Sequence, residues 1–417
     1  MTGIKRKFAA IMISCSMIVL SVNPGRVYAT DNSGRDDQNI DDSKGTSISE
    51  EQKVDDNKGT SESEEQKVDD SKVTSGIEDQ NIDDSKVNTV DQEKEEKTAE
   101  SEDVRITISA AGDVTLSSDI KQPASVNFFS VYNKQKDDSY FFRNVKSIFE
   151  QDDLSIVNFE GTLSNRGSRV EKQWAFRGKP SYINILTEGS VEAVAFANNH
   201  VRDYGVVSYS DTIKSFDKAG IIYSSDTRIG IYEVKGIKIG MISIQETSRS
   251  DAKTILRKAI KAMKKKKPKL LIVSFHWGIE RTSNITRSQK ELSRIAIEEG
   301  GANLVLGHHP HVLQPIEKYK DAYIVYSLGN FCFGGNTNPP DKDTMIYQQT
   351  FTFHNKKLVP SDEVNIIPCS VSSVTNRNNY QPTPATGSEK KRILKKMNGY
   401  CKQFGIAFDK KGRLVAE

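Results

Sequence analysis

Short apolar runs alternate with longer amphipathic segments from residue 104 onward, and this alternation predicts a folded α/β domain. Runs typical of buried or half-buried strands cover Arg105–Ala110, Leu154–Asn158, Val191–Phe196, Leu270–Phe275 and Leu304–Leu306. Helical spacing of apolar residues covers Phe141–Phe149, Val206–Ala219, Ala252–Lys267 and Thr286–Glu299. A hairpin is expected over Tyr232–Ser243, and later strands over Ala322–Ser327, Met345–Phe353 and Val364–Ser370.

Several of these strands run into polar residues of the kinds that bind metals. These residues are Asp113, Glu160, Asn199, His276 and His309. In partly parallel sheets, ligands bind beyond the carboxyl ends of the strands. The mixture of imidazole, carboxylate and amide groups suits divalent Mn, Fe or Zn better than Ca. One or two such ions are expected, because a pair about 3.5–4 Å apart is a common arrangement for hydrolysis.

Three of the six histidines of the chain lie in the segment from Gly307 to His311. His309 and His311 are two residues apart, so in an extended segment their side chains point the same way and both reach one cluster. His308 would then face the opposite side, and we interpret it as a packing residue. His276 ends the most apolar strand, which favours a ligand role because buried polar groups need partners.

His200 adjoins Asn199 and precedes Asp203 by three residues. Asp203 could orient and charge the imidazole, which would make His200 a general acid for a leaving alkoxide. The alternative is a structural His200 beside an Asn199 that caps a helix.

Three further residues are candidates for contact with substrate or for support of the site. Arg177 could clamp an anion or be a surface arginine, and Glu280 could support the metal site or cap a helix. Asn330 could support the site or belong to a tight turn after a strand.

The first 103 residues differ in composition from the rest of the chain. Residues 1–29 combine a basic start, an apolar run and Val27-Tyr28-Ala29, a pattern that predicts a signal peptide; an uncleaved N-terminal membrane anchor is the alternative. Residues 30–103 contain four 14-residue repeats, which begin at Gln38, Gln52, Gln66 and Gln80. Each repeat is acidic and has few apolar residues, so we expect a disordered spacer.

Charge is distributed unevenly, because residues 31–103 have a net charge of −16 and residues 104–417 have +15. A basic domain suits an anionic polymer or a phosphorylated envelope substrate, or a membrane surface. Nucleic acid is not expected, because the chain has a secretion signal and no recognition motif. We assign residues 104–384 to the folded domain and residues 385–417 to a basic tail, expected as a helix and a short strand.

Six segments in ordered succession resemble the bacterial CapA family, the poly-γ-glutamate capsule biosynthesis group related to calcineurin-like metallophosphoesterases. The segments are Ala111–Asp113, Asn158–Gly161, Ala197–Gly205, His276–Glu280, Gly307–Gln314 and Ser327–Phe331. The resemblance implies a four-layer αββα sandwich. It also implies that Asp113, Asn199, His276, His309 and His311 bind metal, and that His200 faces the substrate.

The chain departs from the superfamily pattern at two metal positions. Thr115 stands where the first motif has a histidine, and Glu160 stands for the bridging aspartate, so a site with one metal is an alternative. We expect a secreted or surface-attached metal-dependent phosphoesterase in capsule, polyglutamate or envelope-polymer synthesis. Membrane-bound capsule synthesis proteins are expected partners. The rival is a non-catalytic component that binds and exports the anionic polymer.

Overall fold

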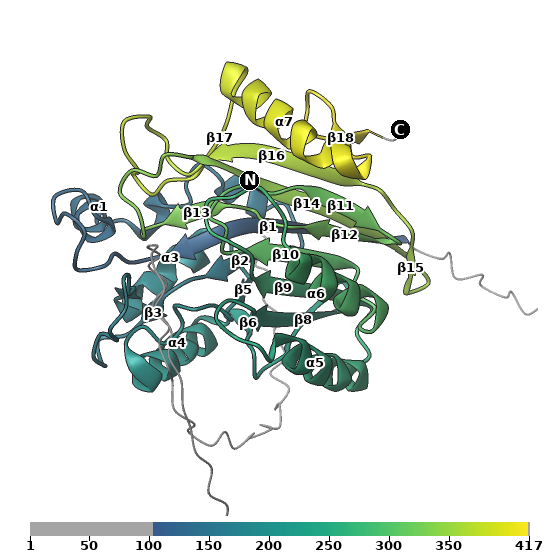
Figure 1. The fold of residues 1–417 in the computed structure, drawn as a ribbon, viewed down its shortest axis with the longest axis horizontal. Helices are drawn as coiled ribbons and strands as arrows, with labels where there is room; N and C mark the ends of the chain where they lie inside the picture. Colours follow the sequence, from purple (N-terminus) through teal and green to yellow (C-terminus); the bar gives the residue numbers. More distant parts are fainter. Residues whose placement is uncertain (1–102, 416–417) are drawn as a thin grey trace, which may run out of the picture. The chain divides into compact units, whose positions relative to one another are not determined.

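The computed structural model describes residues 103–415, which belong to one compact unit (Figure 1). The expected signal peptide and the repeat-containing spacer lie outside the described residues. None of the helices within residues 103–415 has the length and apolar character needed to cross a membrane.

A mixed nine-stranded sheet forms the first half of the sandwich, in the order β17-β16-β14-β1-β2-β5-β6, with β13 beside β1 and β15 beside β14. The long strand β1 (Asp103–Thr115) is antiparallel to β14 (Asp343–His354) and parallel to β2 (Leu154–Phe159). The other strands are β5 (Ala193–Ala195), β6 (Ile222–Ser224), β13 (Asn330–Phe333), β15 (Lys357–Val359), β16 (Val364–Ser370) and β17 (Thr383–Pro384).

The second sheet has six strands in the order β11-β12-β10-β9-β8-β7. Its centre is parallel and fully buried, as the continuous apolar run of β9 (Leu270–His276) requires. The other strands are β7 (Gly230–Val234), β8 (Ile237–Gln245), β10 (Leu304–His308), β11 (Ile316–Tyr319) and β12 (Ala322–Val325). The expected hairpin over Tyr232–Ser243 is confirmed as β7 and β8.

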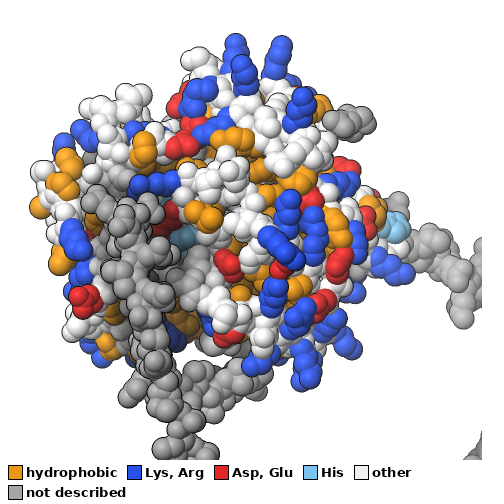
Figure 2. Space-filling view, viewed as in Figure 1, with side chains coloured by type: hydrophobic (Ala, Val, Ile, Leu, Met, Phe, Trp, Pro, Cys, Tyr) orange, Lys and Arg blue, Asp and Glu red, His pale blue; other side chains and the backbone are white. Residues whose placement is uncertain are grey.

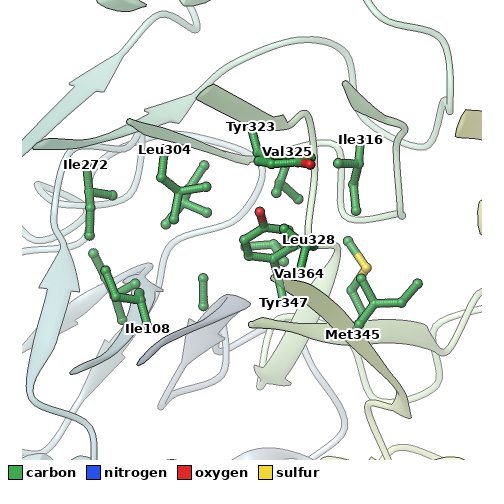
Figure 3. Close-up of a cluster of buried hydrophobic side chains, with 14 of the residues drawn as sticks. Ile108, Ile272, Leu304, Ile316, Tyr323, Val325, Leu328, Met345, Tyr347 and Val364 are labelled. Carbon is green, nitrogen blue, oxygen red and sulfur yellow. The ribbon is translucent and has the colours of Figure 1, made fainter. Parts of the chain in front are cut away.

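The two sheets pack face to face through one apolar core. Figure 3 shows Ile108 and Tyr347 of the first sheet opposite Ile272 and Leu304 of the second, and all four are buried. On the outer side of the second sheet lie α5 (Ala252–Lys266) and α6 (Arg287–Glu298). On the outer side of the first lie α1 (Phe128–Gln135), α2 (Lys146–Phe149), α3 (Ile183–Glu188) and α4 (Gly205–Ala219). The four-layer αββα sandwich is therefore confirmed.

Local sequence explains most of the helix boundaries. Thr286 caps α6 through a complete capping box with Gln289, and Gly220 ends α4 in the left-handed conformation. The expected helix over Phe141–Phe149 is wrong in its first half, because only Lys146–Phe149 is helical. Phe141 and Phe142 are both buried in turns, where their rings pack against Phe128 and Phe331.

The basic tail packs on the sandwich. Helix α7 (Gly387–Cys401) contributes Ile393, Leu394, Met397 and Cys401 to the core between the sheets. It is followed by a small hairpin of β18 (Ala407–Phe408) and β19 (Leu414–Val415). The three cysteines of the described residues, Cys332, Cys369 and Cys401, are all buried and free.

Candidate metal centre

The site lies where parallel strands from both sheets end. β1 carries Asp113, β2 carries Asn158 and is followed by Glu160, and β9 and β10 end at His276 and His308. The pairing of β1 shifts register around Asp113 on both sides, which marks a bulge. Bulges re-aim side chains, and this one turns a buried carboxylate towards the end of the sheet.

Asp113 is fully buried and touches three side chains. Asn158 Nδ2 donates to its Oδ1 at 2.8 Å, His308 Nδ1 lies 3.4 Å from the same oxygen, and His311 Nδ1 lies 3.1 Å from Oδ2. Burial alone would raise the pKa of Asp113, but the two histidines hold it well below its usual range. Asp113 is therefore ionised in a site shielded from water.

Glu160 is the second buried carboxylate, and neither of its oxygens has a hydrogen-bond partner. Its Oε1 lies 3.5 Å from His200 Nε2 and 4.0 Å from His311 Nε2. Burial raises the pKa of Glu160 to about 8, and the nearby charge of His311 opposes this only in part. Buried carboxylates normally have partners, so these oxygens are free for a cation.

Asn199 and His276 approach one another from different sheets. His276 Nε2 lies 2.8 Å from Asn199 Oδ1, and His276 Nδ1 lies 3.4 Å from Asn158 Nδ2. Burial lowers the pKa of His276 well below its usual value, so the ring is neutral near pH 7. A neutral imidazole is the form that binds metal.

His309 and His311 both reach the cluster, but the expected extended backbone is wrong. Their φ angles are 94° and 57°, so both residues adopt left-handed conformations after β10 ends. The His309 ring lies 4.7 Å from that of His276 and 5.8 Å from that of His311, between ring centroids. Burial lowers the pKa of His309 to about 4, and its Nδ1 has no hydrogen-bond partner.

His200 and Asp203 form a close pair. His200 Nδ1 lies 2.6 Å from Asp203 Oδ2, and the Phe176 ring packs 4.6 Å from the imidazole. Lys172 Nζ donates to Asp203 Oδ1 at 2.7 Å and to the Asn199 carbonyl at 2.9 Å. Burial lowers the pKa of His200, and Asp203 opposes that shift. Because Asp203 holds Nδ1, the ring presents Nε2 to Glu160.

The three support candidates have different positions. Glu280 is exposed, and its carboxylate lies within 4.8 Å of ligand atoms of His309 and His311. Asn330 Oδ1 accepts from His311 Nδ1 at 2.9 Å, so Asn330 positions one of the candidate ligands. The Arg177 guanidinium is occupied by other contacts. Its Nη1 donates to the carbonyls of Arg166 and Gly167, and the group stacks on the Tyr204 ring.

Sequence reasoning misplaced one residue and missed three. His308 does not face the opposite side, because its Nδ1 lies 3.4 Å from Asp113 Oδ1. The buried side-chain amide of Asn198 donates to that of Asn158, which in turn donates to Asp113. Lys172 contacts the His200 ring. The position of Asn158 at a strand end was a usable signal, whereas nothing local marks Lys172.

The residues present fit divalent cations. Among the described residues, Asp113, Glu160 and His276 form one group whose ligand atoms lie within 4.8 Å of one another, and Glu280, His309 and His311 form another. The buried atoms of Glu160 and His309 that have no hydrogen-bond partner are of the kinds that bind a divalent cation. Thr115 Oγ1 is buried without a partner, but a neutral hydroxyl is a poor substitute for imidazole.

The family model of the bacterial capsule synthesis protein PGA_cap matches residues 107–335, which contain every metal-ligand candidate. The chain belongs to this family. The expected resemblance to the CapA group is thereby confirmed.

Two Bacillus relatives are similar over part of their length. The capsule biosynthesis protein CapA of Bacillus anthracis is 29% identical over 274 residues, covering 59% of this chain and 64% of that protein. The PGA biosynthesis protein CapA of Bacillus subtilis (strain 168) is 31% identical over 224 residues, covering 48% of this chain and 58% of that protein. The match thus spans about three-fifths of each relative.

Solved structures give more distant similarities. The calcineurin-like phosphoesterase YfkN from Bacillus subtilis matches with a TM-score of 0.44 and 14% identity, over 71% of this chain and 98% of that chain. A hypothetical protein from Thermus thermophilus matches with a TM-score of 0.40 and 13% identity, over 63% of this chain and 98% of that chain.

Proposed function

We propose that this PGA_cap family member is a metal-dependent hydrolase of phosphomonoesters or phosphodiesters. The observation that carries the proposal is the convergence of buried, incompletely paired ligand atoms beside the His200–Asp203 pair. Asp113, Glu160, Asn199, His276, His309 and His311 would hold one or two ions, with Mn, Fe or Zn as candidates. Divalent cations in such a site neutralise phosphate charge and activate water at neutral pH.

The chain's own residues supply the proton and the orientation. Asp203 accepts from His200 Nδ1 and stabilises the protonated ring, so the proton on Nε2 can pass to a leaving alkoxide. Lys172 and Phe176 fix this pair from one side. Nε2 lies 3.5 Å from Glu160, which places the proton donor at the edge of the metal cluster.

Family membership supports a role in capsule, poly-γ-glutamate or related anionic envelope-polymer synthesis. We extend this to a secreted or cell-surface location, with an anionic polymer or phosphorylated envelope substrate and membrane-bound capsule synthesis proteins as partners. The apolar run and the small residues of the first 29 positions support this location.

The test is phosphatase and phosphodiesterase assay of the full chain with added Mn²⁺. We expect metal-stimulated turnover that falls at least a hundredfold in His200→Ala, as loss of a general acid predicts, and disappears in His309→Ala. His354→Ala is the matched control, because His354 is exposed and pairs only with Asp103 in the described structure. Absence of metal-stimulated turnover in the wild type would contradict the proposal that the chain is an enzyme.

A second candidate is a non-catalytic component that binds anionic polymer. Figure 2 shows Lys and Arg side chains gathered over α7 and over α5, and Thr115 in place of the superfamily histidine also favours this candidate. It predicts polyglutamate binding that weakens with salt and survives His276→Ala. Turnover with no measurable polymer binding would exclude it.

A further inference from the structure

The turn that follows β9 carries an acidic side chain that the proposed ligand set leaves out. Glu280 is exposed in this turn, and its carboxylate makes no hydrogen bond or ion pair with any residue of the described chain, 103–415. An exposed carboxylate of this kind is ordinary on a protein surface. Its position relative to the metal centre therefore decides whether it can do more.

Backbone hydrogen bonds fix this turn against the segment that follows β10. Trp277 N–H donates to the His308 carbonyl at 3.0 Å, and Arg281 N–H donates to the Pro310 carbonyl at 2.8 Å. Glu280 lies between the two donors in sequence. The two contacts therefore place it alongside the histidines that follow β10.

Two imidazoles lie close to the Glu280 carboxylate. Ligand atoms of Glu280, His309 and His311 all lie within 4.8 Å of one another. His309 is only 8% exposed, and its Nδ1 has no hydrogen-bond partner among the described residues. Asn330 Oδ1 holds His311 Nδ1 at 2.9 Å, so the Nε2 atom of that ring faces the site. Atoms bound to one ion at about 2.1 Å lie at most roughly 4.2 Å apart, so a small movement of the exposed Glu280 side chain is enough.

We propose that Glu280, His309 and His311 bind a divalent cation at a second, outer position of the metal centre. Two histidines and one carboxylate form a set that binds Zn²⁺ or Fe²⁺ and leaves other coordination positions open. Glu280 is thus a metal ligand, rather than a residue that contacts substrate. The inference rests on the metal centre of the proposed function but does not depend on phosphoester hydrolysis.

The outer position differs from the inner group of ligands in its access to water. Asp113, Glu160 and His276 are at most 1% exposed, whereas Glu280 is exposed and His311 is partly exposed. The inner group also offers two carboxylates where the outer position offers one, and cation affinity rises with the number of charged ligands. We therefore expect two ions of unequal affinity, with the weaker one beside Glu280.

Mn²⁺ titration of the metal-stripped full-length chain tests this, with unbound Mn²⁺ measured by electron paramagnetic resonance. We expect two ions per wild-type chain. Glu280→Gln should weaken binding of the second ion at least tenfold and leave the first unchanged, because even loss of a partner that only orients a ligand costs about 10–100-fold. The substitution is on an exposed side chain, so the fold should be unaffected.

Glu171→Gln is the matched control, because it removes the same charge from another exposed glutamate in a loop beside the site. Glu171 has no ion pair within residues 103–415 and is next in sequence to Lys172, which contacts the His200 ring. Both affinities should stay unchanged in this variant. Fewer than two ions per wild-type chain, an unchanged second affinity in Glu280→Gln, or equal weakening in the two variants would overturn the outer position.

Phosphoesterase turnover, measured on the same samples, separates this inference from the proposed function. Turnover with a single bound ion would overturn the outer position and leave the hydrolase proposal intact. Two bound ions, the second dependent on Glu280, would support the outer position even without turnover.

Discussion

His309 has a φ of 94°, a backbone conformation that residues other than glycine seldom adopt. His311, two residues on, is also left-handed at 57°. Each such residue costs of order 1–3 kcal/mol, and strain of this kind gathers at functional sites. Because both imidazoles reach the cluster through these conformations, we interpret the strain as the cost of placing two ligands.

Replacing His309 by glycine should separate stability from metal binding. His309→Gly removes the strain, so we expect the metal-free protein to gain about 1 kcal/mol in unfolding free energy. It should also lose Mn²⁺ affinity by at least a hundredfold, measured by calorimetry. Lys136→Gly is the control, because Lys136 is left-handed at the end of α1, far in sequence from any ligand. Unchanged Mn²⁺ affinity in His309→Gly would contradict its role as a ligand.

Asn330 offers a gentler test of the site. Its side chain holds His311 from both ends, through Oδ1 to Nδ1 at 2.9 Å and Nδ2 to the backbone carbonyl at 3.2 Å. Asn330→Ala should lower Mn²⁺ affinity about 10–100-fold, as loss of a ligand-orienting partner usually does. Asn184→Ala on the exposed side of α3 should have no effect. Equal affinities in the two variants would remove Asn330 from the site.

At the scale of elements, the end of β1 and the turn that follows β12 are joined by a close backbone contact. Asp113 N–H donates to the Gly329 carbonyl at 2.9 Å, and a Cβ at Gly112 would lie 1.9 Å from that oxygen. This contact explains why glycine occupies position 112. It also couples the bulge that aims Asp113 to the turn that leads into Asn330.

Gly112→Ala should therefore destabilise the fold by about 2–3 kcal/mol, because backbone must shift to admit the methyl group. Gly399→Ala is the matched control: it lies in α7, and a Cβ there meets nothing within 4 Å. Alanine is the better helix former, so this variant should gain up to about 1 kcal/mol. Thermal denaturation measures both, and a neutral Gly112→Ala would show that the contact is not rigid.

Apolar periodicity predicted the long elements of the sandwich well. Leu270–Phe275 and Ala252–Lys267 match β9 and α5 to within a residue. Elements whose pattern depends on distant packing were missed or wrong, as at Phe141 and Phe142, whose burial is set by aromatic partners such as Phe128 and Phe331. Local sequence contains no record of those partners.

At the scale of the whole molecule, buried titratable side chains gather in the candidate metal centre. They make the stability of the metal-free protein depend on pH in an unusual way. Burial raises the pKa of Glu160 to about 8, from 4.5. Burial opposes the shift at His311, but Glu160 and Asp113 raise its pKa to about 9, from 6.5. Below pH 6.5, the lowered pKa values of His276 and His309 have the opposite effect on stability to the raised pKa values of Glu160 and His311. Above pH 6.5, the folded chain binds more protons at Glu160 and His311 than the unfolded chain does.

Stability of the metal-free protein should therefore fall as pH rises from about 6.5 to about 9, most steeply up to about 8, where both raised groups contribute. Denaturant titration in the presence of a chelator measures this, with an expected loss on the order of 1–3 kcal/mol. Glu160→Gln should flatten the slope, because a neutral amide does not titrate. Rising stability over that range would contradict the assigned protonation states.

Sequence alone located the ligand candidates because strand ends converge in a predictable way. It misjudged orientation where the backbone departs from regular structure, as at His308 and His309. It also could not predict Lys172, which reaches His200 from an irregular loop 28 positions away. Strain and long-range contacts, rather than residue type, determine these placements.

Mn²⁺ binding to the metal-stripped full-length chain, followed by calorimetry with elemental analysis, tests the metal centre most directly. We predict one or two ions per chain, binding that is lost in His276→Ala and His309→Ala, and unchanged binding in His354→Ala. No bound Mn²⁺ in the wild type, or full binding after loss of His276 and His309, would contradict a metal centre at this position.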